Sequence, residues 1–347
     1  MPIQNSKKTV VFLWTVPGRI QIFEFCRALL IKSIGRNEET VAITILHHYS
    51  EKRNCNFINK KTEVHSMNEK NVAFRTLIDR PGIIMCAGVY DAVSARIAEQ
   101  SGFDAVYMTG NGTMASLYGV PDIGIATMSD MLMRAHLISN AVSVPLLADC
   151  DNGYGNLNNV KYAVSEFEAL GASGVHIEDQ GMPKKCGAMA GVKIIPAEEM
   201  AEKVKAAVEA RKDPNFIICA RTDSNPGMGI DEVIRRCKMF AAAGADFIYP
   251  EMVRTKEELL KVAVAVDNAP ILYDHLELDD GNLYSAKELE SMGVKMVTSP
   301  LSAMFAVCHT LKAFYRHYRT TGNTADYLDK MVSIKEYEKI LGIDNYL

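Results

Sequence analysis

Two carboxylates one residue apart, Asp149 and Asp151, follow the apolar run VPLLA near the middle of the chain. Such a run is typical of a buried strand, and at the end of a strand both side chains can turn into one opening. Two nearby carboxylates raise each other's pKa unless a cation lies between them. With Glu178 expected close by, oxygen ligands without His or Cys favour Mg²⁺, and Mn²⁺ is the alternative. The spacing therefore predicts a site for a hard divalent ion.

Other polar residues also follow strand-like runs. They are Tyr107 with the stretch TGNG (109–112), Glu178 with Asp179, Arg221 with Asp223, and Glu251. The stretch TGNG suggests backbone amides presented to an anion. The alternative for Asp179, Asp223 or Asp274, each taken alone, is a helix N-cap, which Asp commonly occupies after a strand.

The segment GMPKKCGAMAG (181–191) is rich in glycine and contains Lys184, Lys185 and Cys186. This composition suits a mobile lid over an active site. The flanking lysines would favour the thiolate, so that Cys186 could exchange a proton near neutral pH. The alternative is a solvated surface loop with an incidental cysteine.

The elements that must position these residues alternate between short apolar runs and amphipathic helical stretches. Strands are expected at 83–87, 105–109, 145–149, 174–179, 216–221, 247–251, 271–274 and 295–299. Eight strand–helix units in about 250 residues are what a (β/α)₈ TIM barrel requires, with its active site at the carboxyl ends of the strands. A doubly wound open sheet is the rival fold, but no GxGxxG turn follows a strand here.

Composition limits the remaining possibilities. Residues 1–66 carry ten Lys and Arg against five Glu, and we expect a poorly ordered N-terminal extension there, followed by a catalytic barrel with C-terminal helices over 67–347. The net charge of −4 indicates no nucleic-acid partner. Eight cysteines without a CxxC pair indicate a reducing, cytoplasmic location. No apolar stretch reaches the roughly 20 residues of a membrane helix.

Over residues 70–347 the chain resembles the isocitrate lyase/phosphoenolpyruvate mutase superfamily. The resemblance rests on six motifs in order: GVYDAVSARIAEQSGFDAVYMTG, YGVPDIG, LLADCDNGYGN, HIEDQGMPKKCGAMAG, PAEEM and ARTD. It is greatest to the short lyases, which are the 2-methylisocitrate lyases, the 2,3-dimethylmalate lyases and the petal-death/oxaloacetate-hydrolase group. The C-terminal helices, from residue 301 onward, resemble a swapped helix, which implies a homotetramer built as a dimer of dimers.

The resemblance also implies roles for individual residues. Catalytic roles fall to Cys186 (the general acid in the gating loop), Glu178, Arg221, Asp122 and Lys184. Substrate contacts fall to Tyr107, Gly110, Asn111 and Arg221, to which we add Glu251 from its place at a strand end. Asp149 and Asp151 match the Mg²⁺ site.

The function implied is a Mg²⁺-dependent carbon–carbon lyase. It would cleave a substituted malate-type 2-hydroxy acid, such as 2,3-dimethylmalate or methylisocitrate, into a 2-oxo acid and a carboxylate. The metal would make the substrate hydroxyl easier to ionise. Arg221 and backbone amides would stabilise the enolate-like intermediate, to which Cys186 would deliver a proton.

Three departures from the family pattern bear on the substrate. Ala188 replaces the histidine of KKCGH, Phe305 replaces an arginine after the motif PLS, and DHLE (274–277) replaces Asn-x-x-Glu. With a cation and an imidazole missing, a dicarboxylate with an apolar substituent is favoured over a tricarboxylate. The alternatives are a phosphonopyruvate-type P–C mutase or hydrolase, an oxaloacetate hydrolase, and a non-catalytic barrel that binds metabolites or a partner protein.

Overall fold

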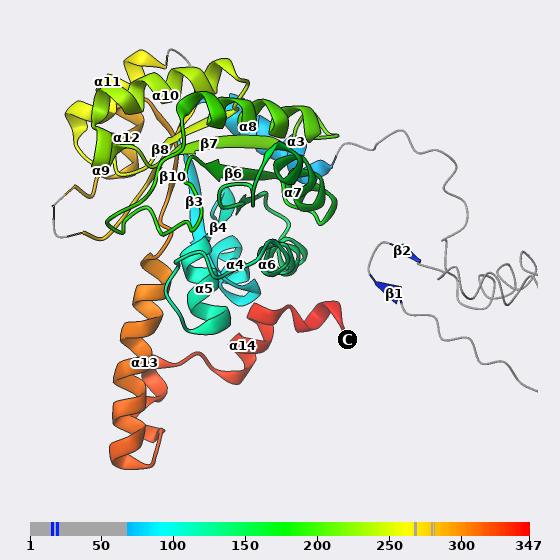
Figure 1. The fold of residues 1–347 in the computed structure, drawn as a ribbon. Coiled ribbons are helices and arrows are strands. Elements are labelled where there is room, and N and C mark those ends of the chain that lie inside the picture. The colour runs from blue at the N-terminus through cyan, green and yellow to red at the C-terminus, as the bar shows by residue number, and fades with distance from the viewer. Residues whose placement is uncertain (1–14, 17–18, 21–67, 267–268, 279, 281) are drawn as a thin grey trace, which may run out of the picture. The chain divides into compact units, whose positions relative to one another are not determined.

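The computed structural model describes residues 15–16, 19–20 and 68–347, apart from 267–268, 279 and 281 (Figure 1). The chain divides into two units, residues 1–66 and 67–347. In the first unit, the described residues are two short antiparallel strands, β1 (Thr15–Val16) and β2 (Arg19–Ile20). The expected poorly ordered extension otherwise lies outside the described residues and stays a prediction.

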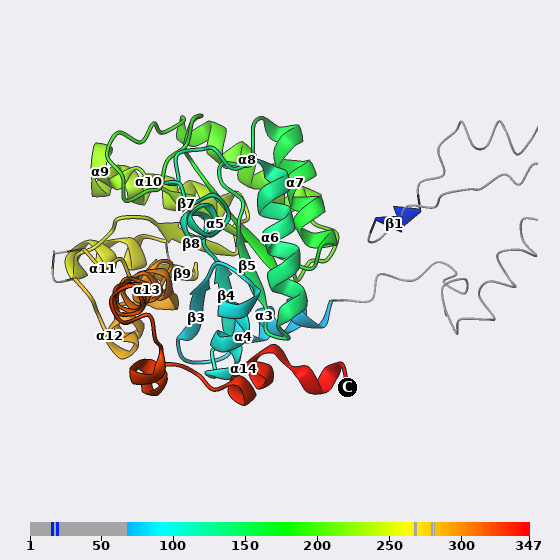
Figure 2. The ribbon, with the colours of Figure 1, turned by 90° about the horizontal axis from the view of Figure 1, so that it is seen from below.

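Eight parallel strands of the second unit close into a barrel in the order β10-β3-β4-β5-β6-β7-β8-β9 (Figures 1 and 2). They are β3 (Ile84–Val89), β4 (Ala105–Met108), β5 (Leu146–Asp149), β6 (Gly174–Glu178), β7 (Ile217–Thr222), β8 (Phe247–Pro250), β9 (Ile271–Asp274) and β10 (Val294–Thr298). Each of the eight expected strands is present to within a few residues. The (β/α)₈ barrel is therefore confirmed over the open sheet.

Helices lie between and after the strands. They are α3 (Glu69–Asp79), α4 (Ala92–Gln100), α5 (Gly110–Tyr118), α6 (Met128–Ala141), α7 (Leu157–Ala169), α8 (Ala197–Ala210), α9 (Asn225–Met228), α10 (Ile230–Ala242), α11 (Lys256–Ala265), α12 (Ala286–Ser291), α13 (Ser302–Thr321) and α14 (Ile334–Leu341), with 3₁₀ turns at Ala325–Lys330 and Ile343–Asn345. Local sequence begins several of them: Asp91, Thr127, Asn156 and Ser285 each accept a hydrogen bond from a first-turn amide in a capping box.

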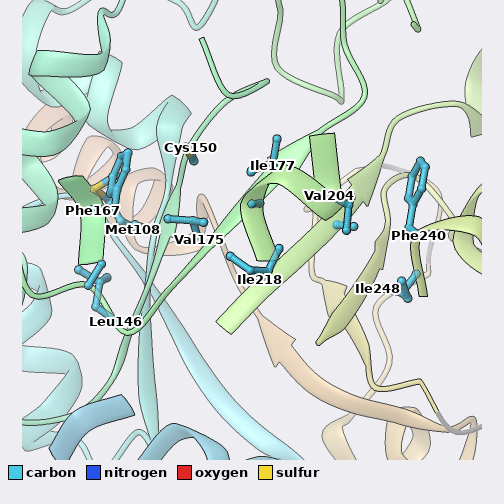
Figure 3. Close-up of a cluster of buried hydrophobic side chains, with 14 of the residues drawn as sticks. Met108, Leu146, Cys150, Phe167, Val175, Ile177, Val204, Ile218, Phe240 and Ile248 are labelled. Atoms are coloured by element: carbon cyan, nitrogen blue, oxygen red, sulfur yellow. The ribbon is translucent and has the colours of Figure 1, made fainter. Parts of the chain in front are cut away.

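The main hydrophobic core lies between the barrel and its surrounding helices (Figure 3). Val175 and Ile218 point outward from β6 and β7, and Phe167, Val204 and Phe240 reach them from α7, α8 and α10. All are fully or almost fully buried. Burying one such side chain stabilises the fold by roughly 1.5–3 kcal/mol.

A second cluster fills the inside of the barrel with the alternate residues of the same strands. At the N-terminal ends of the strands it is closed by Phe74 of α3, whose ring centre lies 6.4 Å from that of Phe247. Apolar side chains therefore pack the amino end of the interior, and the polar residues are left for the carboxyl end.

Helix α13 projects away from the barrel (Figure 1). None of its residues is buried in the single chain, and Phe305, Leu311 and Tyr315 are 49%, 42% and 60% exposed. The chain then returns to the barrel, where α14 contacts α4 and Gln100 Nε2 donates to the Ile340 carbonyl at 3.2 Å. Within residues 68–347, no helix is both long and apolar enough to cross a membrane.

The packing of α3 against the barrel floor gives a test of the fold. Phe74→Ala should lower the free energy of unfolding by about 3–5 kcal/mol, since it leaves a cavity where the side chain is completely buried. Val72→Ala, on the same helix but 37% exposed, is the control and should cost far less. Urea denaturation followed by circular dichroism measures both, and equal losses would contradict this packing.

Candidate active site

A pocket opens at the carboxyl ends of the barrel strands. Its lining includes Tyr107, Gly110, Asn111, Asp122, Asp149, Glu178, Lys184, Cys186, Arg221 and Glu251. Asp151, the one other residue predicted for the site, is 3% exposed and contacts Lys184. The structure thus brings the residues selected from the sequence into one place.

The turn at the end of β5 places two carboxylates, of which Asp149 is held by backbone amides. Asp149 accepts hydrogen bonds from the amides of Gly110 (3.0 Å) and Asp151 (2.9 Å). Asp151 has a φ of 46°, in the left-handed region that a non-glycine residue adopts only at some cost. The turn after the strand therefore holds both carboxylates in one buried cluster.

Within this cluster, the ammonium group of Lys184 supplies a positive charge. Its Nζ lies 2.9 Å from Asp122 Oδ1 and contacts Asp151 Oδ1. Burial acts to lower the pKa of Lys184, but the surrounding carboxylates outweigh it and hold the pKa well above its usual value. The repulsion that the spacing DCD predicts is thus relieved in part by a lysine of the chain itself.

The donor set also fits a hard divalent ion. In the part of the chain that the structure describes, no three His, Cys, Asp or Glu side chains form a ready cage for a metal. Mg²⁺, however, is usually held by one or two carboxylates and keeps several waters. Asp149 and Asp151 supply such oxygens, and Glu178 Oε1 is buried without a hydrogen-bond partner. Two carboxylates and a third available oxygen meet that requirement.

His176 is a residue of the site that the sequence reasoning missed. Its Nε2 lies 2.7 Å from the Tyr107 hydroxyl and 3.4 Å from Asp149 Oδ1, and its ring stacks on that of Tyr107. Burial lowers its pKa to about 4, so the imidazole is neutral near pH 7. The available signal was its spacing: His176 stands two residues before Glu178, so both point into the barrel.

Arg221 is held in place by acidic neighbours. Its Nε and Nη2 donate to Asp223 Oδ1 at 3.0 and 2.8 Å. Glu178 and Glu251 lie 3.7 and 3.6 Å from the guanidinium group. The guanidinium also lies 5.1 Å from the centre of the Tyr249 ring. This fixed cation faces the pocket, where it can bind a carboxylate.

The N-cap alternative for three aspartates is wrong. Asp179 is completely buried and accepts hydrogen bonds from Thr222 Oγ1 (2.6 Å), the Asp223 amide (2.9 Å) and Arg236 Nη1 (3.0 Å). Asp223 holds Arg221, and Asp274 lines the pocket. Neighbouring strands surround these side chains, so they connect strand ends instead of starting helices.

Lys184, Cys186 and Gly187 place the segment 181–191 at the pocket, which it covers as a lid, and movement of this lid stays a prediction. Gln180 fastens it, since its side chain accepts from the Lys185 amide (2.9 Å) and donates to the Lys185 carbonyl (2.8 Å) and to Asp223 (2.8 Å). A Cβ at Gly187 would lie 2.3 Å from Arg221 Nη2, so only glycine lets the lid approach so closely. The solvated-loop alternative is wrong for Lys184 and Gly187, which are buried, although Ala188 is exposed.

The prediction that lysines activate Cys186 is also wrong. Lys184 points to Asp122 and Asp151, while Lys185 donates to the Ala190 carbonyl at 3.4 Å. Burial raises the pKa of the thiol above its usual value, although the Asn111 side chain and the Ala188 amide oppose the shift. Cys186 therefore carries its proton at neutral pH, as a proton donor must.

The stretch TGNG begins helix α5. Two of its amides are bound within the protein, because Gly110 donates to Asp149 and Gly112 donates to Thr109 Oγ1 (3.3 Å). A Cβ at Gly110 would lie 2.3 Å from Asp149 Oδ2. In this structure Gly110 thus orients Asp149, and its amide is not free for a bound anion.

Comparison with known proteins gives consistent relatives. A family model described as phosphoenolpyruvate phosphomutase matches residues 74–318. The 2,3-dimethylmalate lyase of Eubacterium barkeri is 37% identical over 270 residues, which cover 78% of this chain and 93% of the lyase. Oxaloacetate acetylhydrolase, solved with 3,3-difluorooxalacetate, superposes with a TM-score of 0.76 at 30% identity, over 81% of this chain and 95% of that one. Phosphonopyruvate hydrolase, solved with oxalate and Mg²⁺, gives 0.72 at 30% identity, over 80% and 96%.

The contact between Gly110 and Asp149 can be tested by metal binding. Gly110→Ala should weaken Mg²⁺ binding by roughly 10- to 100-fold, because the added methyl group displaces a carboxylate that we expect to bind the ion. Isothermal titration calorimetry gives the affinity, and far-UV circular dichroism shows whether the fold is kept. Gly227→Ala is the control, since its Cβ would meet no atom within 4 Å. Unchanged Mg²⁺ affinity in Gly110→Ala would contradict the assignment.

Proposed function

Because the chain belongs to the phosphoenolpyruvate mutase/isocitrate lyase superfamily, we propose that it is a Mg²⁺-dependent carbon–carbon lyase. The proposed substrate is a substituted malate, of which 2,3-dimethylmalate is the type, and the products are a 2-oxo acid and a carboxylate. The observation that carries the proposal is the position of Cys186, which lines the same pocket as Arg221 and Asp149 and whose pKa is raised by burial. Cleavage of a C–C bond leaves a carbanion, and this arrangement offers it a proton.

The two ends of the pocket suit the two halves of such a substrate. Asp149 and Asp151 would hold the divalent ion at one end, and Glu178 would bind its water. When bound, the ion would supply positive charge that makes the substrate hydroxyl easier to ionise. Glu178 Oε1, buried and without a partner, is the group we assign to accept the hydroxyl proton. Burial raises the pKa of this carboxyl group, while Arg221 and Lys184 oppose the shift and favour the ionised form that accepts.

The chain's own residues account for the remaining steps. Arg221 binds the carboxylate of the departing fragment and stabilises the negative charge that develops on it. Tyr107 and Asn111 orient the substrate, and His176 fixes the Tyr107 hydroxyl. Cys186 then protonates the fragment carbon from the lid, which also excludes water. Lys184 is charged and bound to Asp122, and so would hold the lid closed.

The second candidate is hydrolysis of oxaloacetate, favoured by the close superposition on oxaloacetate acetylhydrolase. This reaction also breaks a C–C bond, and water attacks the 2-oxo carbon of the substrate. The third candidate is cleavage of a P–C bond, because phosphonopyruvate hydrolase shares the fold. A proton donor such as Cys186 suits the lyase and both hydrolases, because each of these reactions leaves an enolate carbon that must be protonated. It disfavours only a P–C mutase, which transfers the phosphoryl group instead, so the products must distinguish the other three.

We further propose that the enzyme is a homotetramer in which α13 packs on a second copy. The helix is 20 residues long, has no buried residue in the single chain, and exposes Leu311 and Tyr315. Apolar surface of this extent on a projecting helix is typical of a protein–protein contact.

The lyase can be tested with a panel of acids. In the presence of Mg²⁺, the enzyme should release a 2-oxo acid from 2,3-dimethylmalate. It should release little oxalate from oxaloacetate and little phosphate from phosphonopyruvate. Cys186→Ser should lower this turnover by roughly 10²- to 10⁴-fold, because the general acid is lost. Cys308→Ser, an exposed cysteine on α13, is the matched control and should be unaffected.

The pH profile gives a second readout of the same role. A group can donate a proton only while it is protonated. When its pKa is raised, it stays protonated until pH rises through that pKa. The loss of turnover that follows from deprotonation of Cys186 should therefore appear only on the alkaline side, as pH rises through the raised pKa of the thiol. Full activity of Cys186→Ser, or loss of wild-type activity already between pH 7 and 8, would contradict Cys186 as the proton donor.

The proposed assembly predicts a change in mass. Leu311→Ser combined with Tyr315→Ser should convert the tetramer to smaller species, since it removes apolar contacts from α13. Light scattering after size-exclusion chromatography measures this. Leu260→Ser, on α11 and 37% exposed, is the control and should keep the wild-type mass. A wild-type monomer, or a double variant of unchanged mass, would overturn the assembly.

A further inference from the structure

Two acids at the β8–β9 side of the pocket have no part in the mechanism above. Glu251 follows β8 and Asp274 ends β9, and both side chains line the pocket at 3% and 4% exposure. Tyr249 also lines the pocket, and its hydroxyl acts to lower the pKa of both carboxyl groups. We call these three residues, Tyr249, Glu251 and Asp274, the acid corner.

The acid corner has unused hydrogen-bonding capacity. Glu251 Oε2 and Asp274 Oδ2 are buried and have no hydrogen-bond partner. Tyr249 has one hydroxyl proton, so it can donate to only one of the two acids at a time. Leaving a buried acceptor unpaired is costly, so these two oxygens indicate a ligand that donates a hydrogen bond to them.

Neither of the two nearby arginines, Arg221 and Arg254, donates a hydrogen bond to these two oxygens. Arg221 directs Nε and Nη2 to Asp223 and lies 3.6 Å from Glu251 through Nη1, which is beyond hydrogen-bonding distance. Arg254 binds the Leu276 carbonyl (2.8 Å) and Asp280 (3.1 Å), behind the strand end. Burial raises the pKa of Glu251 to about 8 and also raises that of Asp274, so the corner does not require a cation.

The rest of this part of the lining is apolar. Leu276, Pro300 and Leu301 line the same pocket. Leu276 and Leu301 are 6% and 9% exposed. A group that enters here therefore meets carbon on one side and two acids on the other. Phe305, a departure from the family pattern, is on α13 and 49% exposed, and is not among the lining residues.

We propose that the acid corner selects a substrate whose substituent ends in an uncharged hydrogen-bond donor, such as a hydroxymethyl group, and rejects a third carboxylate. This rests on the proposed lyase function and refines its substrate class. A hydroxyl group donates and accepts one hydrogen bond each, so it can pair with an acid in either protonation state. A carboxylate has no proton to donate, so an ionised Asp274 stays unpaired and repels it, while a protonated Glu251 offers it only a single hydrogen bond.

The proposal can be tested by binding, without turnover. Methylsuccinate, hydroxymethylsuccinate as its open-chain salt, and tricarballylate share a succinate frame and differ only in a methyl, hydroxymethyl or carboxymethyl substituent. None carries the 2-hydroxyl group that cleavage needs. In calorimetry with Mg²⁺, the wild type should bind hydroxymethylsuccinate most tightly and tricarballylate at least tenfold more weakly.

Asp274→Asn keeps the size of the side chain and removes its acidity. It should bring tricarballylate to within about threefold of hydroxymethylsuccinate and leave methylsuccinate affinity within about twofold of wild type. Asp231→Asn, in the exposed first turn of α10, removes the same formal charge and should preserve the wild-type order. An unchanged ratio of tricarballylate to hydroxymethylsuccinate in Asp274→Asn, or tricarballylate as the tightest wild-type ligand, would overturn the proposal.

These outcomes are separable from failure of the lyase assignment. The binding order is measured on unreactive acids, so it holds or fails whichever bond the enzyme breaks. Absence of a 2-oxo acid product from every malate tested would reject the lyase while leaving the acid corner intact. The reverse result, cleavage with no discrimination among the three succinates, would reject the acid corner alone.

Discussion

The structure depends on the neutralisation of many acids buried at one rim. Asp122, Asp149, Asp151, Glu178 and Glu251 are all nearly inaccessible to solvent. Burial of a carboxylate is unfavourable unless it is paired, hydrogen-bonded or protonated, and each solution is used here. Lys184 and Arg221 provide charge, backbone amides bind Asp149, and burial raises the pKa of Glu251 to about 8.

One of these cations belongs to the lid, which joins closure to charge balance. When the lid is closed, Lys184 reaches Asp122 and Asp151, and Gly187 lies on Arg221. The same closure buries Cys186 and raises the pKa of its thiol. Because the lid makes these contacts together, opening it would remove a counter-charge and expose the proton donor in a single movement.

The barrel makes such a concentration of charge possible by separating functions along each strand. Outward residues such as Val175 and Ile218 pack against the helices, and inward residues at the amino end pack around Phe74. Only the carboxyl ends of the strands are left for polar groups. His176 is an exception to this division, because it lies in the middle of β6 and faces Tyr107 and Asp149.

The sequence by itself determined the eight strands, the closed barrel and many of the residues that gather at the pocket, because alternation, strand-end polarity and ordered motifs are local properties of the chain. It missed His176, Tyr249 and the apolar residues of the lining. It could not determine which group each side chain meets. Cys186 next to two lysines suggested a thiolate, yet Lys184 turns to Asp122, and Asp179 suggested a cap, yet it binds Thr222 and Arg236. Such partners come from strands and loops far apart in sequence. Desolvation, which sets the protonation of Cys186, Glu251 and His176, exists only once the barrel and lid enclose them.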